Sequence, residues 1–178
     1  VRAGLLCNDS ELIEREGQWE VRGDPTEGAL IVAARKAGMS QADDSDLPPR
    51  LAVIPFESQH QYMATLHDLG DAQPRIIYMK GAIEAILARC TSMLDASGHL
   101  VACDAIAVQR MADEIAVAGL RVLTFARGAL PAGTNEIHHL DVSGGLTRLP
   151  AGRYSRQDDY RRPRIDCHSD CRASWPGW

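Results

Sequence analysis

Hydrophobic residues follow two different periods along this chain, and the change from one period to the other marks where elements begin and end. Three segments, 51–56, 61–67 and 75–80, have the length and the apolar composition of strands. The middle segment alternates between two sets of residues, as in a strand whose successive side chains point to opposite faces. Turn-forming residues at 68–71 separate the last two segments, so we expect these two strands to pair antiparallel.

The clearest helix signal lies between Asp24 and Gly38, where both ends are marked. Asp24 can cap the first amides, and Pro25 suits the first helical position. Glu27 stands where a capping box places a carboxylate, and Gly38 can close the last turn. A short strand at 19–22 is expected just before this helix.

A second helix is expected over 104–118. Its apolar residues have the i, i+3, i+4, i+7 spacing of one buried stripe: Val108, Met111, Ala112 and Ile115. The other expected elements are a short helix at 82–89, a hairpin turn at 95–98, and strands at 122–125 and 136–142. The whole pattern predicts an α+β fold, with a mainly antiparallel twisted β-sheet flanked by helices.

Composition narrows the possible function classes. The 178 residues suit one domain, and a net charge of −5 argues against a nucleic-acid binder that works through a broad basic face. No apolar run approaches the roughly 18–20 residues of a membrane helix, and the chain does not open on a signal-peptide pattern. The five cysteines are odd in number and scattered, which favours reduced thiols in a cytosol over a disulfide framework.

The composition changes abruptly near Arg148, which predicts a domain at 1–147 and an atypical tail at 148–178. The tail has seven Arg, no Lys and a net charge of +3, against −8 for the rest of the chain. Because it lacks apolar periodicity, we expect it to be irregular or disordered. A segment read in an altered frame is the alternative.

Several common sites are missing from the sequence. It contains no Gly-x-x-x-x-Gly-Lys phosphate loop, no Gly-x-Gly-x-x-Gly and no Gly-x-Ser-x-Gly. The cysteines of the CHSDC segment at 167–171 do not have the usual zinc spacing. His138 and His139 would face opposite ways on a strand, so we expect an exposed pair and no metal site.

Four segments together resemble the nucleotide-binding domain of P-type cation-transporting ATPases. They are GDPTEGAL at 23–30, PFESQHQYMATL at 55–66, MKGAIE at 79–84 and GLRVL at 119–123. They occur in the family's order and at compatible separations, within about residues 1–147. Cys7-Asn8-Asp9 is similar to the family's entry to this domain.

The resemblance implies a nucleotide-binding site, with ATP bound through its adenine and its phosphates pointing towards a neighbouring domain. The implied site residues are Glu27, Phe56, Ser58, Met63, Lys80, Gly81, Ala82, Arg121 and Leu123. In this reading Phe56 offers a flat face to adenine, Glu27 accepts a hydrogen bond from the adenine amino group, and Arg121 meets the polyphosphate. Lys80 lies against adenine and approaches phosphate oxygens, while Gly81 lets the nucleotide approach the backbone.

Each of these residues also has a purely structural interpretation. Phe56 could end a strand in the core, Lys80 could be an exposed strand-end residue, and Glu27 could serve only the capping box. Arg121 could form a surface salt bridge. Packing alone could explain the apolar positions Met63, Ala82 and Leu123.

Two positions depart from the family pattern. Gln61 stands where many members carry a basic residue, so one phosphate or adenine contact becomes neutral. Ile83 replaces a frequent proline, which affects only the rigidity of the loop.

The family's phosphorylated aspartate lies in an Asp-Lys-Thr-Gly segment that this sequence lacks. We therefore expect ATP binding without catalysis by this chain, with Mg-ATP as the ligand in the intact pump and no catalytic or metal-binding residue of its own. The implied partner is the phosphorylation domain of the same parent pump, on the cytoplasmic face of a membrane transporter. The alternative is a regulatory or docking module that keeps the fold with little nucleotide affinity.

Overall fold

The computed structural model describes residues 1–39, 47–70 and 72–150. Its elements are α1 (Arg2–Leu6), β1 (Glu11–Arg15), β2 (Gln18–Arg22), α2 (Pro25–Lys36), β3 (Arg50–Glu57), β4 (Tyr62–His67), β5 (Arg75–Gly81), α3 (Ile83–Leu87), β6 (Cys90–Leu94), β7 (Leu100–Ala102), α4 (Ala105–Val117), β8 (Thr124–Leu130), the 3-10 helix η1 (His139–Val142) and β9 (Leu146–Arg148). No helix within the described ranges is long and apolar enough to cross a membrane.

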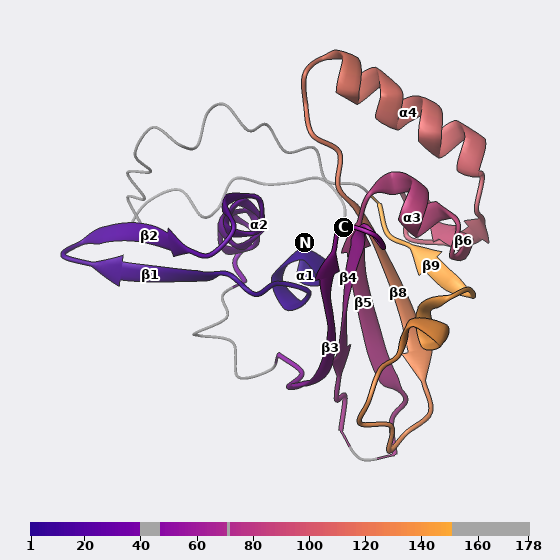
Figure 1. The fold of residues 1–178 in the computed structure, drawn as a ribbon, viewed down its shortest axis with the longest axis horizontal. Coiled ribbons are helices and arrows are strands. Elements are labelled where there is room, and N and C mark those ends of the chain that lie inside the picture. Colours follow the sequence, from indigo (N-terminus) through magenta and orange to yellow (C-terminus); the bar gives the residue numbers. More distant parts are fainter. Residues whose placement is uncertain (40–46, 71, 151–178) are drawn as a thin grey trace.

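A seven-stranded sheet forms the centre of the molecule, in the order β3-β4-β5-β8-β9-β6-β7 (Figure 1). All neighbours pair antiparallel except β6 and β9, which are parallel. The strands β1 and β2 form a separate antiparallel hairpin. The predicted α+β class, with a mainly antiparallel sheet flanked by helices, is confirmed.

Both faces of the sheet are covered, which explains why all six residues of β4 are buried. On one face, here called the α1 face, Met63 and Tyr78 pack with α1 residues such as Leu6. On the other, the α3 face, Tyr62 and its neighbours pack with Ile86 of α3. Figure 1 shows α1 and α2 on one side of the sheet and α3 on the other. The alternation predicted for 61–67 therefore separates two cores.

Helix α2 begins and ends where the sequence predicts. The Asp24 carboxylate accepts hydrogen bonds from the amides of Thr26 (2.8 Å) and Glu27 (3.2 Å). Gly38 has a φ of 79°, and its amide donates to the carbonyl of Arg35 at 2.9 Å, so the helix ends in a left-handed turn.

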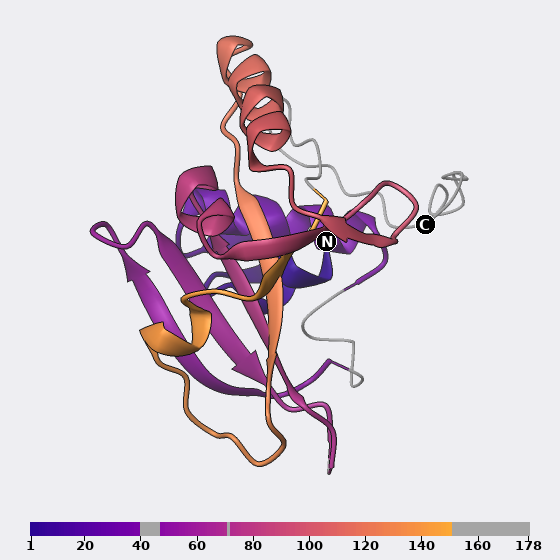
Figure 2. The same cartoon turned by 90° about the vertical axis from the view of Figure 1, so that its right-hand side faces the viewer.

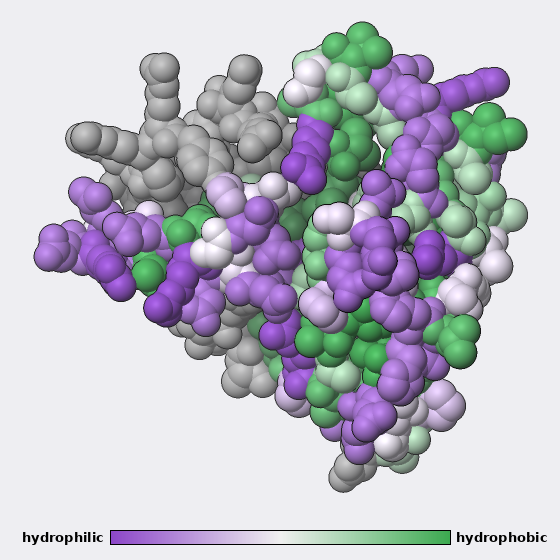
Figure 3. Space-filling model, viewed as in Figure 1, coloured by the Kyte–Doolittle hydropathy of each residue, from purple (hydrophilic) through white to green (hydrophobic). Residues whose placement is uncertain are grey.

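Helix α4 covers less of the core than its apolar stripe predicts. Val108 and Ala112 are buried against Ile83 of α3, but Met111 is 57% exposed. Figure 2 shows α4 extending beyond the end of the sheet, and Figure 3 shows hydrophobic and hydrophilic side chains side by side over it. Since α4 packs mainly on α3, with Met93 of β6 at the edge of this cluster, only a narrow part of the stripe finds a partner.

Two further expectations change, and two elements appear that the sequence did not predict. Residues 136–142 do not form a strand: the amide of His138 donates to the Asp141 carboxylate at 2.7 Å, and this side-chain contact favours the turn of η1. The strand expected at 122–125 begins at Thr124 and runs on to Leu130. Helix α1 and strand β1 were not predicted, because five residues are too few for a clear period.

The boundary expected between 147 and 148 falls inside β9. Arg148 pairs with Ala126 of β8 and is buried, although the Arg-rich composition assigned it to the tail. The expected irregular tail beyond residue 150 lies outside the described residues.

Candidate functional site

A buried ion pair joins α2 to the central sheet. Nζ of Lys80 lies 2.6 Å from Oε1 of Glu27, and the two side chains are only 6% and 17% exposed. Lys80 stands near the end of β5 and Glu27 in the first turn of α2, so 53 residues of chain separate the two charges. Lys80 is therefore not the exposed strand-end residue of the structural interpretation.

The other carboxylate oxygen of Glu27 holds the segment between α1 and β1. Oε2 accepts hydrogen bonds from the amide of Asp9 (2.9 Å) and the hydroxyl of Ser10 (3.3 Å). The side-chain amide of Asn8 donates to the Glu27 carbonyl at 2.9 Å. The capping-box role considered for Glu27 is wrong in this respect, because the carboxylate points towards Lys80 and this segment.

Strand register places Met63 beside Lys80. The two residues are cross-strand partners in β4 and β5, and both point to the α1 face. Met63 is fully buried in a cluster with α1 residues, against which Phe125 of β8 packs, so the packing interpretation holds for its present surroundings.

A bulge in β3 sets the direction of Phe56. The β3–β4 ladder is irregular between Ile54 and Glu57, which leaves one extra residue on β3. Glu57 pairs with Tyr62, which points to the α3 face, so regular alternation from Glu57 would turn the preceding Phe56 towards the α1 face. Phe56 is 56% exposed, so its interpretation as a core residue is wrong, and one aromatic face is available to a ligand.

Close packing explains why residue 81 is a glycine. A Cβ at this position would lie 2.4 Å from the carbonyl oxygen of Gln61 and 2.8 Å from Cβ of Tyr62. The amide of Ala82 donates to the same Gln61 carbonyl at 3.0 Å, which fixes the start of α3. Close packing of β5 on the β3–β4 turn therefore suffices to explain glycine here, whether or not a nucleotide approaches.

The remaining predicted residues lie around this group. Arg121 is exposed, and its charge acts on Asp24 at the start of α2. Burial alone would raise the pKa of Asp24, but amide hydrogen bonds from Glu27 and Thr26, with the Arg121 charge, hold it below its usual value. Leu123 is half-buried before β8, while Ser58 is exposed in the β3–β4 turn. A shallow hollow elsewhere, lined by residues including Pro48 and Asp68, contains none of the predicted residues.

The structure thus brings Glu27, Lys80 and Met63 together, with Phe56 one strand away and Arg121 near the start of α2. A profile of the cytoplasmic domain N of P-type ATPases matches this chain over residues 1–155. The chain belongs to the P-type ATPases.

Relatives of this domain N are whole transporters. The chain is 50% identical over 146 residues to the cation-transporting ATPase pma1 of Synechocystis, which covers 82% of the chain and 16% of that protein. It is 41% identical over 172 residues to the probable cation-transporting ATPase F of Mycobacterium tuberculosis, covering 97% of the chain and 19% of that protein. A mouse calcium-transporting ATPase, type 2C member 1, is 34% identical over 137 residues, covering 72% and 14%. The chain therefore spans less than a fifth of the length of these relatives.

Sequence reasoning about this domain N missed how the segment after α1 is used. Asn8 is buried and donates to the carbonyls of Gly4 and Glu27, while its own Oδ1 accepts from the amide of Ser10. In the sequence, Cys7-Asn8-Asp9 stands out only through the resemblance to the family. Burial raises the pKa of the Cys7 thiol to about 11, so this thiol is structural and not a nucleophile at neutral pH.

Proposed function

We propose that this domain binds ATP on the α1 face of the sheet, between Phe56 and the Glu27–Lys80 pair. The observation that carries the proposal is that the partly buried Glu27 carboxylate is paired with the buried Lys80 ammonium group at the same end of the sheet as the exposed Phe56 ring, which lies two strands from Lys80. These three groups come from α2, β3 and β5.

The chemistry of each group fits one part of the nucleotide. Phe56 stacks on the adenine ring, and the remaining lone pair on Oε1 of Glu27 accepts from the adenine amino group. Lys80 already neutralises Glu27, so an uncharged purine meets a site with no net charge. The phosphates then extend towards Arg121, whose guanidinium can donate to them. The nucleotide is bordered by Ser58, Ala82 and Leu123. Gly81 has no side chain, so the nucleotide can approach the backbone at the end of β5.

The domain positions ATP and leaves phosphoryl transfer to another part of the pump. In this proposal the γ-phosphate of Mg-ATP is presented to an aspartate on the phosphorylation domain, at the cytoplasmic face of a cation-transporting ATPase. The contribution of the domain is orientation and local concentration, which can supply a large part of the rate of a reaction between two bound partners.

Calorimetric titration of the 178-residue chain with ATP tests the proposal. Phe56→Ala is expected to weaken saturable binding by roughly 5- to 150-fold, which corresponds to about 1–3 kcal/mol of lost stacking. Leu100→Ala is the matched control, since Leu100 is an exposed apolar residue on β7, at the opposite edge of the sheet from β3. Equal losses in both variants, or no loss in Phe56→Ala, would reject the stacking role.

The same titration separates ATP binding from the docking alternative. Gln61→Lys restores the basic residue found in many family members and is expected to tighten binding, because it adds a positive charge beside the proposed phosphate path. Absence of saturable binding in both the unmodified chain and Gln61→Lys would favour a module that retains the fold for docking.

A further inference from the structure

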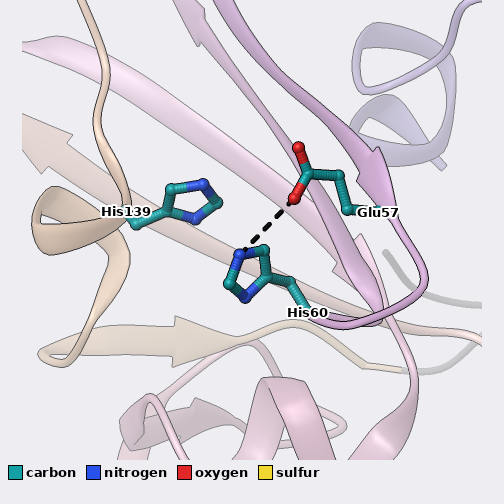
Figure 4. A group of neighbouring side chains, drawn as sticks. All are labelled: Glu57, His60 and His139. Atoms are coloured by element: carbon teal, nitrogen blue, oxygen red, sulfur yellow. Dashed lines mark ion pairs between the residues drawn. The ribbon is translucent and has the colours of Figure 1, made fainter.

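A second cluster of polar side chains lies on the other face of the sheet. Glu57, His60 and His139 each offer one ligand atom, and these atoms all lie within 4.8 Å of one another. Nε2 of His60 is 3.5 Å from Oε2 of Glu57, and the two imidazole rings have centroids 4.3 Å apart. Figure 4 shows the three side chains converging from two separate parts of the chain.

The fold holds the three residues in place from both sides. Glu57 is the last residue of β3, and the tight turn after it is closed by the His60 amide, which donates to the Glu57 carbonyl at 3.0 Å. His139 begins η1, and its Nδ1 lies 2.6 Å from the hydroxyl of Tyr62. This hydrogen bond restrains the His139 ring, as the outer hydrogen bonds of metal-bound histidines do.

The cluster is separate from the proposed nucleotide site. Tyr62, which contacts His139, belongs to the core on the α3 face together with Ile137 and Val142. Lys80 and Met63 point to the α1 face. The sheet lies between these two groups, and the two sites approach each other at the β3–β4 turn, where Ser58 and Gln61 flank His60 in sequence.

We propose that Glu57, His60 and His139 bind a divalent transition-metal ion of the zinc class. Two imidazole nitrogens and one carboxylate oxygen form a donor set that zinc accepts, with a fourth position open to water. Around a tetrahedral zinc with bonds of about 2.0–2.1 Å, ligand atoms lie about 3.3 Å apart. The Glu57–His60 distance is already close to this value, and the partly exposed side chains leave room for the remaining contraction.

One of two neighbouring contacts changes when the ion binds. Nε2 of Gln59 lies 2.8 Å from Oε2 of Glu57 and 3.3 Å from Nε2 of His60. A metal at the cluster replaces the second contact, because the His60 nitrogen then gives its lone pair to the ion. Binding also requires neutral imidazoles, because a protonated ring nitrogen has no lone pair to give to the ion.

The test is titration of the chelator-treated chain with zinc, followed by calorimetry, and with cobalt, followed by its visible absorption. The background carries Cys167→Ser and Cys171→Ser, so that these two thiols cannot supply the site. One ion per chain is expected, and His60→Ala and His139→Ala should each weaken it by at least about 10-fold, since each removes a direct ligand.

His138→Ala is the matched control, because His138 is exposed, next in sequence to His139 and outside the cluster. Its affinity should equal that of the background chain. Thermal unfolding of each metal-free variant verifies folding, since His60 and His139 are not core residues. Equal zinc affinity in His139→Ala and His138→Ala, or loss of binding in the double-serine background alone, would overturn the proposal.

Discussion

Two ion pairs connect the N-terminal part of the chain to the central sheet, and their surroundings are opposite. In each pair the closest nitrogen and oxygen are 2.6 Å apart: Lys80–Glu27 and Arg50–Asp9. The side chains of the first pair are 6% and 17% exposed, and those of the second are 40% and 50% exposed. Distance alone would rank the two contacts as equals.

The two ion pairs differ in how well water can solvate a charge that has lost its partner. At the Arg50–Asp9 pair, solvent solvates either charge once its partner is gone, so the net gain from the contact is small. At the Lys80–Glu27 pair, loss of one partner leaves a charge in a poorly solvated place. The buried pair is thus a strong constraint on where α2 sits, and the exposed pair is a weak one.

The largest expected effect comes from breaking the buried pair. Lys80→Met should lower the free energy of unfolding by about 3 kcal/mol, the lower end for an uncompensated buried charge. The lower end applies because Glu27 keeps its bonds to Asp9 and Ser10. Urea unfolding followed by circular dichroism measures the loss.

A second substitution separates the charge effect from simple loss of packing. Adding Glu27→Gln to Lys80→Met removes the orphaned charge and should restore a large part of the lost stability. If Lys80→Met costs no more than breaking the exposed pair, burial does not control the strength of these contacts.

A smaller loss is expected from loosening the helix turn that carries Glu27. Asp24→Ala removes the acceptor for two amides of α2 and should cost about 1 kcal/mol, a typical value for an N-cap. Asp24→Asn retains an oxygen acceptor and should cost clearly less. Equal losses in the two variants, measured by the same urea unfolding, would argue that charge and not capping fixes the start of α2.

Local patterns in the sequence predicted much of the fold. Alternation within 61–67 gave β4 and its two faces, and the cap residues around Asp24 and Gly38 gave both ends of α2. The strand predicted at 136–142 was wrong, because a side-chain hydrogen bond outweighs the apolar spacing there. The Asp141 carboxylate accepts from the His138 amide and favours a helical turn at 139–142. It also failed at Arg148, because composition does not reveal that β9 completes a ladder with a strand distant in sequence.

The proposed nucleotide site and the proposed metal site differ in how well the sequence predicts them. Glu27 and Lys80 are 53 residues apart, so no period could pair them, and only the resemblance to a family linked them before the structure did. No resemblance to a family linked His60 to His139 before the structure did. His139 was expected on a strand beside an oppositely facing His138, and its place in η1 next to Tyr62 depends on tertiary packing.

Breaking the exposed pair should have a small effect. Arg50→Gln is expected to lower the free energy of unfolding by about 0–1 kcal/mol, with a smaller loss at high salt, as for other exposed pairs. Arg22→Gln is a matched control, since Arg22 is more exposed and lies 3.8 Å from Glu11. A loss as large as that of Lys80→Met would remove the distinction between the two pairs.

The smallest expected effect is an electrostatic change in the pKa of His67, a residue outside both ion pairs. His67 is buried, with its ring nitrogens near the Pro48 carbonyl (3.1 Å) and the Thr65 hydroxyl (2.9 Å). Burial lowers the pKa of His67, and the charges of Arg50 and Arg2 lower it further, against the Pro48 hydrogen bond. Arg50→Gln should therefore raise the pKa of His67, though not to its ordinary value, because burial is the larger cause.

The sign of the resulting pH dependence is fixed by linkage. Below about pH 6.5 the unfolded chain protonates His67 more readily than the folded chain does, so stability is lost as the pH falls. In Arg50→Gln this loss should be shallower, because the folded pKa lies closer to the unfolded one. Urea unfolding at about pH 7.5 and about pH 5.5, compared with Arg22→Gln, measures the difference. Equal slopes in the two variants would mean that the Arg50 charge is screened before it reaches His67, and that the exposed pair acts on nothing beyond its own two side chains.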